Sequence, residues 1–593
     1  MKVLNKITWM ALVSCMLVSV GCQKVLDEKN RSGLARDYFT SPGGIDAAVI
    51  ATYSNLRNWY CQEGMCYNTM IGTDENIPGF GTSGNFHTYT LQANDGGINS
   101  IWEWSYRSIN NANGVLQYAD AAGLTTAQAT QLKAEAKFMR AYYYFMLVIT
   151  FGDVSISTQF ASSPSTSATR EPIATVYDLI VKDLTEALVD LPAKPTSPGR
   201  AGKAATLHLL SKVYLTRGWS TAAKATDFTD AYTTANSLIT NKATYGIDLW
   251  SDYADMWKEA NDYSNKEVIF QIERNTDPKG SETTGIGTGN PGGKFNGANF
   301  YQRPNYPIFS VNLNGGITGA PAFTLNGTAT ATTNPVDRDV AYGRPFGRVR
   351  PSNYVLNTAF ADKTNDTRYA KTFQLIYMFN RPGPLAAQTP VTIVVTRAAS
   401  PGNPAGPLAQ YTWQKGVDTA IILTGKATVT EDERKVTKSY LMTTNQYDVN
   451  MFPSNKKHDD VTRAHTNDAS DRPFPLMRFA ETYLIAAEAA FKGGSSLTNA
   501  ANMINVVRNR AGALPITSAD VTLDFILDER TRELFGEWMR WYDLVRTKTL
   551  QARLATYNPI PAFRADRDYL RPIPLQQINL VTTGPKYPQN PNY

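Results

Sequence analysis

Cysteine and histidine are both scarce, with four of each in 593 residues. Cys15 and Cys22 lie within or directly after an apolar N-terminal stretch, so Cys61 and Cys66 remain for the rest of the chain. These two could form a disulfide or stay as unlinked thiols, because the geometry of the folded chain decides. A metal site needs more ligands than two cysteines, and no histidine lies beside them in the sequence. We therefore expect no bound metal.

A strong charge of one sign is also missing. The chain has 58 Lys and Arg against 52 Asp and Glu, and loss of Lys2 and Lys6 with an N-terminal leader leaves 56 against 52. No stretch is dense in Lys or Arg, which argues against nucleic acid as a partner. The sequence has no Gly-Lys-Ser/Thr phosphate loop, nucleophile elbow or dinucleotide-binding fingerprint, so we expect no cofactor.

The N-terminus has the pattern of an export signal. Residues 1–6 carry two cations, residues 7–20 are mainly apolar, and Gly21 and Cys22 close the run. The apolar stretch is too short to span a bilayer as a mature helix. It resembles the leader of bacterial lipoproteins, although Ser19 stands where leucine is usual. The resemblance implies removal of residues 1–21 and acylation of Cys22; the alternative is an ordinary secretory leader with a chance cysteine.

Apolar residues are plentiful, and in two parts of the chain they recur with the period of a helix. The hydrophobic fraction is 42%, which excludes disorder, and 31 tyrosines are present. Ile45, Val49, Tyr53 and Leu56 fall on one helical face. Further helices are expected over residues 101–119, 126–149, 173–191, 201–216 and 231–239. Small residues where these helices would cross are typical of tetratricopeptide-like repeats.

The middle of the chain lacks helical periodicity. It contains Gly-rich and Thr-rich stretches, and residues 391–395 and 420–423 are expected to form short strands. We therefore expect a mainly α fold, in which a tetratricopeptide-like helical-repeat scaffold carries a large loop-rich elaboration with short strands. As one composite domain over residues 22–593, it would have helical repeats mainly in 35–275 and 471–550. The elaboration would span about 275–470, and residues 551–593 would form a C-terminal segment.

Several short motifs follow one another in the last hundred-odd residues. They are RPFPLMRFAE at 472–481, ILDER at 526–530 and RWYDLVR at 540–546. In the N-terminal half, EAKFMRAYYY at 135–144 and FGDV at 151–154 belong to the same set. In this order the motifs resemble the SusD/RagB family of outer-membrane nutrient-binding lipoproteins. The resemblance spans residues 22–593 and thins between about 275 and 450.

The resemblance implies a non-catalytic protein, lipid-anchored at the outer membrane and facing the cell exterior. It would bind oligosaccharides or polysaccharide fragments and deliver them to a SusC-like TonB-dependent transporter. A RagB-like protein of the same scaffold would bind peptides instead. A glycoside hydrolase is the enzymatic alternative, with Glu529 and Glu533 as its acid and base. Their helical spacing favours ion pairs within the scaffold.

Two loop segments are candidates for the ligand site, residues 73–99 and 290–314. Both combine aromatic side chains with Asn, Asp or Arg, and sugars present apolar faces and polar rims. The alternative is that the aromatic side chains anchor long loops to the helices. The ligand-contacting residues expected on this basis are Asp74, Asn85, Phe86, His87, Tyr89, Phe300, Tyr301 and Arg303.

Overall fold

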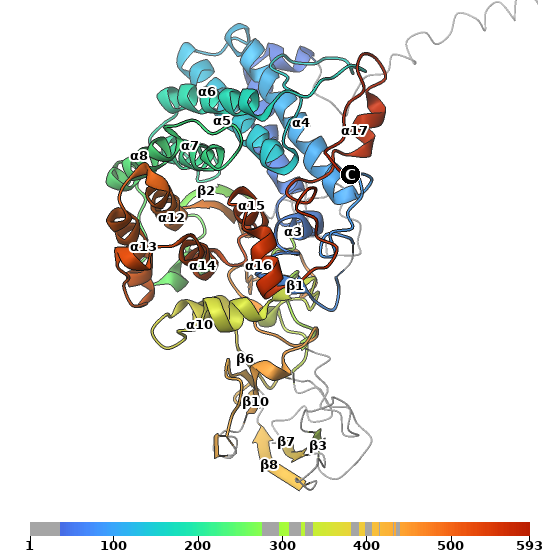
Figure 1. The fold of residues 1–593 in the computed structure, drawn as a ribbon, viewed down its shortest axis with the longest axis vertical. Helices are drawn as coiled ribbons and strands as arrows, with labels where there is room; N and C mark the ends of the chain where they lie inside the picture. Colours follow the sequence, from blue (N-terminus) through green and yellow to red (C-terminus); the bar gives the residue numbers. More distant parts are fainter. Residues whose placement is uncertain are drawn as a thin grey trace, which may run out of the picture.

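The computed structural model describes residues 36–82, 84–274, 296–306, 322–325, 336–380, 391–397, 406–413, 416–430, 432–433 and 439–593. The expected leader and Cys22 lie outside the described residues, as does part of the segment 290–314. Most described residues belong to helices or to the turns between them (Figure 1). The expected mainly α fold is thereby confirmed.

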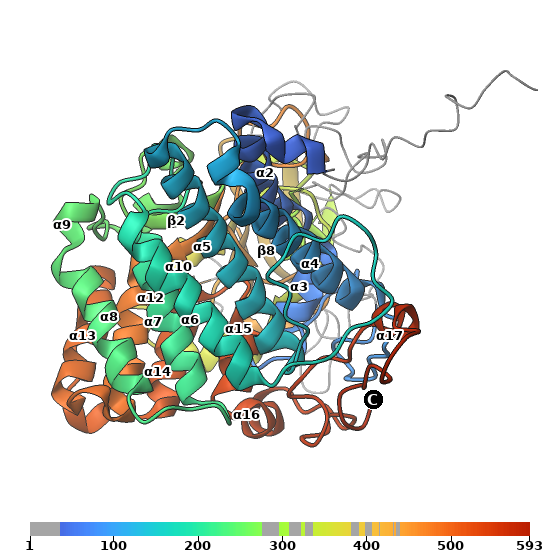
Figure 2. The ribbon, with the colours of Figure 1, turned by 90° about the horizontal axis from the view of Figure 1, so that it is seen from above.

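The N-terminal half is a stack of helices, in which each helix from α3 to α7 packs against the next along the chain. Figure 2 shows α5, α6, α7 and α8 side by side as one layer. The bounds are α2 (Pro42–Ser54), α3 (Glu63–Thr69), α4 (Gly96–Tyr118), α5 (Thr126–Phe151), α6 (Ile173–Asp190), α7 (Lys203–Gly218), α8 (Asp227–Thr240) and α9 (Lys242–Tyr245). A short 3₁₀ helix, η1 (Arg36–Thr40), precedes α2. No helix in the described part of the chain combines the length and apolarity that crossing a bilayer requires.

Helix α5 shows how the local sequence sets these bounds. Thr125 and Gln128 form a reciprocal capping box at its start. It ends at Gly152, whose φ of +75° favours glycine. Within the helix, Arg140 donates two hydrogen bonds of 2.8 Å to Asp183 of α6, and a third to Asn113 of α4. The motif at 135–144 therefore holds three helices together.

The C-terminal helices complete the same body, although they are far away in sequence. Helix α12 (Phe479–Ala489) packs against α7 and α8 (Figure 1). Just before it, β12 (Phe474–Arg478) pairs antiparallel with β2 (Val268–Ile272). The remaining helices are α13 (Leu497–Ala511), α14 (Leu523–Leu534), α15 (Arg540–Arg546), α16 (Leu550–Tyr557) and α17 (Leu575–Leu580).

The central part of the chain forms short strands that extend from the helical body (Figure 1). Both expected strands are confirmed: β7 covers Val391–Arg397 and β9 covers Thr419–Leu423. The others are β1 (Asn76–Pro78), β3 (Ala322–Leu325), β4 (Val349–Pro351), β5 (Phe373–Gln374), β6 (Ile376–Met378), β8 (Gly406–Trp413), β10 (Tyr440–Met442) and β11 (Ser454–Asn455). Short helical turns interrupt them, among them η8 (Tyr354–Ala359) and α10 (Arg368–Thr372). A separate hydrophobic cluster around Tyr306 and Tyr377 supports β6, β9 and β10.

Cys61 and Cys66 are buried free thiols, which decides between the two alternatives left open by the sequence. Burial raises the pKa of Cys61 to about 11, so its reactive thiolate form is suppressed at neutral pH. The Cys66 thiol lies 3.9 Å from the sulfur of Met70. Both side chains therefore serve as small core residues.

Candidate ligand-binding site

The two loop segments expected to carry the ligand site meet at one short strand, β4. On one side β4 pairs with β1, with Asn76 opposite Pro351 and Pro78 opposite Val349. On the other side Arg348 N–H donates to the carbonyl of Tyr301 at 2.8 Å. Parts of the chain more than two hundred residues apart thus form one surface region where the helices meet the strands (Figure 1).

Six of the eight expected side chains are buried at this meeting point. Their exposed fractions are 5% or less: Asp74, Phe86, Tyr89, Phe300, Tyr301 and Arg303. The aromatic rings pack against the chain itself, and the Tyr89 hydroxyl donates to the Gly72 carbonyl at 2.6 Å. These positions correspond to the anchoring alternative, because large rings stabilise long loops by burying their area. In this conformation the six cannot contact a ligand at the surface.

Asn85 and His87 remain half-buried, so they are the accessible members of the expected set. Burial lowers the pKa of His87, which favours the neutral ring. Its Nδ1 is sealed from solvent and has no hydrogen-bond partner. Both residues can still contribute to a surface site beside the junction of β1 and β4.

The junction also exposes two further aromatic residues: Phe80, which lies in the candidate segment 73–99, and Phe346, which the sequence did not single out. Phe80 is 37% exposed, and its backbone N–H donates to the Val449 carbonyl at 3.2 Å. Phe346 is half-buried and lies 6.0 Å from Tyr301, centroid to centroid. One sequence feature could have indicated this exposed aromatic residue, the run Gly343-Arg344-Pro345-Phe346-Gly347-Arg348. We call Phe80, Arg344, Phe346 and Arg348 the aromatic–arginine surface.

Three glycines allow the two chain segments of this surface to approach so closely. A side chain at Gly79 or Gly81 would collide with backbone atoms of the segment that leads into β4. A side chain at Gly347 would collide with the ring of Phe80, and Gly347 also has a φ of +34°. The Phe80 ring therefore lies directly against bare backbone, which holds it in one position.

Arg348 is fixed by three kinds of contact. Its guanidinium lies 3.8 Å from the centroid of the Phe346 ring. It forms an ion pair of 2.9 Å with Glu63 and donates to the Gly81 carbonyl at 2.5 Å. Arg344 lies 4.7 Å from the same ring. Exposed rings beside planar guanidinium groups offer both a stacking face and hydrogen-bond donors, which suits a sugar.

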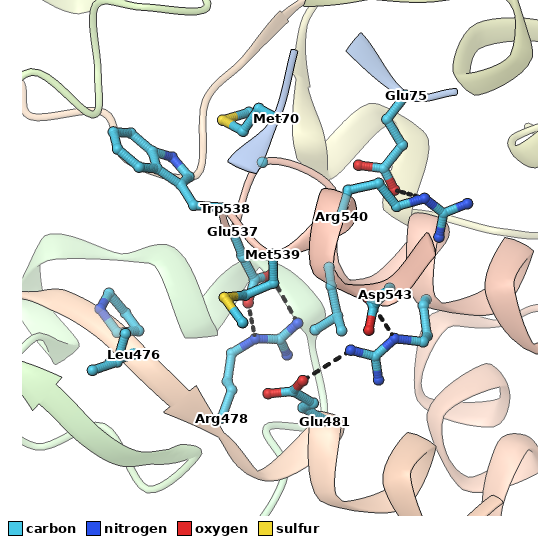
Figure 3. Close-up of a pocket in the computed structure, with 14 residues that line it drawn as sticks. Met70, Glu75, Leu476, Arg478, Glu481, Glu537, Trp538, Met539, Arg540 and Asp543 are labelled. Carbon is cyan, nitrogen blue, oxygen red and sulfur yellow. Dashed lines mark hydrogen bonds and ion pairs between the residues drawn. The ribbon is translucent and has the colours of Figure 1, made fainter. Parts of the chain in front are cut away.

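The charged side chains of the C-terminal motifs lie elsewhere, in a closed cluster of ion pairs. Figure 3 shows Arg478 bound to Glu537. Arg530 donates hydrogen bonds to Asp543 at 2.8 Å and to Glu481 at 2.9 Å. The cavity between these residues has a volume of about 30 Å³. That volume holds a few water molecules at most and no sugar ring.

Glu529 and Glu533 belong to the same cluster, and their surroundings exclude the acid–base role. Both are fully buried, and both bind Arg368, at 2.8 and 3.0 Å. Burial raises the pKa of Glu529, but the guanidinium groups of Arg368, Arg532 and Arg508 outweigh this effect and lower the pKa to about 2. The pKa of Glu533 is also lowered, by Arg510, Arg478 and Arg368 against the effect of burial. A general acid needs a raised pKa, so this pair cannot supply one.

A larger cavity of about 580 Å³ lies within the helical body and shares no residue with the aromatic–arginine surface. Phe145 and Val148 of α5 line one side, and Trp219, Tyr569 and Leu570 line others. Its cations include Arg546, which is paired with Glu488. Among the described residues no group of three His, Cys, Asp or Glu side chains is placed to hold a metal ion. The cavity is a second location to be tested for ligand.

Comparison with known proteins matches the whole chain. Residues 26–215 match the family model described as "Starch-binding associating with outer membrane". SusD-like protein P2 of Formosa agariphila is 24% identical over 610 residues, covering 99% of each chain. The starch-binding protein SusD of Bacteroides thetaiotaomicron is 25% identical over 430 residues, covering 72% of this chain and 65% of SusD.

Solved structures share the fold. A laminarin-binding SusD-like protein superposes with a TM-score of 0.60 at 21% identity, covering 93% of this chain and all of the other. A SusD homologue from Bacteroides thetaiotaomicron gives 0.65 at 19% identity, covering 94% and 98%. Residues 211–593, more than half of the chain, match the model of the SusD family. The chain therefore belongs to the SusD family, whose members are non-catalytic binding proteins.

Proposed function

We propose that this protein captures oligosaccharides or polysaccharide fragments outside the cell and delivers them to a SusC-like TonB-dependent transporter. Capture takes place at the aromatic–arginine surface, where Phe80 and Phe346 stack on sugar rings. Arg348, Asn85 and His87 supply hydrogen bonds at the rim. The ligand leaves chemically unchanged.

One observation carries this proposal: Phe80 and Phe346 emerge at the junction of two loop segments that the rest of the fold holds in place. Phe80 is 37% exposed, whereas Phe86 and Tyr89 of the same loop segment are buried. The buried anchors Tyr89 and Tyr301 hold the loops, so the exposed ring is pre-positioned. The relatives named for starch and laminarin binding support a sugar as the ligand.

Calorimetric titration of a glycan panel tests the location of the site. Phe80→Ala and Phe346→Leu should each weaken binding about tenfold, or about 1.4 kcal/mol. Leucine at 346 keeps most of the packing volume but removes the aromatic face. Tyr38→Ala is the matched control, because Tyr38 is 47% exposed on η1. Loss of binding in Tyr569→Ala alone would place the ligand in the 580 Å³ cavity instead.

The peptide alternative is tested with the same protein. If a peptide mixture binds and no glycan binds or displaces it, the ligand class is peptide and the glycan proposal fails. Retained glycan binding in the presence of excess peptide supports the proposal. Aromatic platforms accept both classes, so competition is more informative than either titration alone.

The proposals of a lipid anchor and of a transporter partner rest on membership of the family and on the pattern of the N-terminal leader. We expect acylation of Cys22 to hold the protein at the outer membrane, so Cys22→Ser should move it from the membrane fraction to the soluble one. We expect a large barrel protein to co-purify from detergent-solubilised outer membrane. Purification of the tagged protein without any barrel protein would contradict the partnership.

A further inference from the structure

Arg344 is a half-buried arginine whose guanidinium has no hydrogen-bond or ion-pair partner among the described residues. Its Nη1 is sealed from solvent without a hydrogen bond. Buried polar groups are nearly always satisfied, so an unpaired guanidinium indicates a missing acceptor.

The charges around Arg344 have the same sign as its own. Burial lowers the pKa of Arg344, and the neighbouring cations Arg338 and Arg348 lower it further. Arg338 is exposed. Nearby carboxylates already have partners: Glu63 pairs with Arg348 at 2.9 Å, and Asp339 accepts from Ala341 N–H at 2.9 Å. Arg348 is thus compensated by Glu63, whereas no described carboxylate forms an ion pair with Arg344 or Arg338.

The guanidinium of Arg344 is also held in a defined position. It lies 4.7 Å from the ring of Phe346 and 6.0 Å from that of Phe300. Two aromatic neighbours fix its plane, while its hydrogen-bonding edge stays unused. A planar guanidinium with free N–H groups matches the two oxygens of a carboxylate or sulfate.

We infer that the ligand of the aromatic–arginine surface is an anionic glycan, whose carboxylate or sulfate group binds Arg344. The inference rests on the proposed function and names its ligand class. A uronic acid and a sulfate ester present the same chemistry to Arg344. Phe80 and Phe346 stack on the sugar rings, and Arg338 adds attraction at longer range.

The test compares three oligosaccharides of equal length with the full-length protein: a neutral one, a uronic-acid one and a sulfated one. We expect at least one anionic oligosaccharide to bind tenfold or more tightly than the neutral one. That advantage should shrink several-fold between 50 and 500 mM salt, because exposed charges are screened. The uronic-acid and sulfated arms identify which anion is bound.

Arg344→Gln should remove the advantage of the anionic oligosaccharides over the neutral one. Arg344→Lys keeps the charge but loses the planar fork, so it should retain part of the advantage. The control is Arg107→Gln, because Arg107 is an exposed arginine paired with Glu103 at 2.7 Å on α4. Since Arg344 has no described partner, its replacement should not lower the melting temperature.

Two outcomes overturn the inference and can be told apart. If neutral and anionic oligosaccharides bind equally, or Arg344→Gln behaves like Arg107→Gln, the anion site is contradicted while glycan capture stands. If no glycan of any charge binds, the proposed function fails as well.

Discussion

Arg540 of α15 forms a two-point ion pair with Asp74, with Nε 2.8 Å from Oδ1 and Nη2 2.7 Å from Oδ2. Arg553 of α16 adds a third bond, to Oδ2. All three side chains are buried. The loop that leads to β1 is thereby tied to the C-terminal helices, and Asp74 holds the aromatic–arginine surface from behind.

Replacing Asp74 should therefore destabilise the fold. Asp74→Asn removes the carboxylate that two buried guanidinium groups share, although Arg553 keeps its ion pairs with Asp524 and Asp528. We expect the loss to cost about 3 kcal/mol in the free energy of unfolding. Urea unfolding measures the change. Asp120→Asn is the control, because Asp120 forms a surface ion pair with Lys133 and should change stability by less than about 1 kcal/mol. Equal effects of the two substitutions would contradict the structural role of Asp74.

Glu75, the next residue, has a raised pKa, whereas the pKa of Asp74 is lowered by Arg540 and Arg553. Burial raises its pKa, Asp74 raises it further, and Arg540 only partly offsets both, so the pKa lies at about 7 instead of 4.5. A raised carboxyl pKa means that stability falls as the pH rises from 4.5 through 7. The shift corresponds to about 3 kcal/mol.

Glu75→Gln should remove that pH dependence. At pH 8 the variant should be more stable than the natural protein, by up to about 3 kcal/mol, and at pH 5 the two should be similar. Chemical unfolding at the two pH values measures this. A variant that is less stable at pH 8 would show that Glu75 is a favourable ion-pair partner of Arg540.

Substitutions at Tyr301 and at Phe80 should have separate effects, the first mainly on stability and the second mainly on binding. Tyr301→Ala opens a cavity in the core and should cost about 3 to 5 kcal/mol of unfolding free energy. Its affinity for glycan per folded molecule should fall by less than that of Phe80→Ala, because Tyr301 holds the loops but does not contact the ligand. Phe80→Ala should do the reverse, with weaker binding and little change in stability. Binding by the folded Tyr301→Ala variant as weak as that of Phe80→Ala would return Tyr301 to the ligand site.

The scaffold was predictable because helices leave a periodic signal in a single stretch of sequence. The helix expected over residues 126–149 is α5, Thr126–Phe151, bounded by a capping box and Gly152. The strands at 391–395 and 420–423 were found for a similar reason, since a short apolar run lies between turns. Such signals are local.

The surface was less predictable, because burial depends on contacts between distant residues. Phe300 and Phe80 are both phenylalanines in loops, yet one is fully buried and the other 37% exposed. The pairing of β1 with β4 makes the difference, and neither strand is longer than three residues. Arg344 was missed because its distinguishing property, the lack of a partner, exists only in the folded chain.

The central claim is tested most directly by equilibrium dialysis of the purified protein against an oligosaccharide that it binds. The recovered sugar is then analysed by mass. We expect saturable binding of one oligosaccharide per chain, at least tenfold weaker binding in Phe80→Ala, and recovered sugar of unchanged length. Unchanged binding in Phe80→Ala, or recovery of shortened products, would contradict a non-catalytic glycan site at this surface.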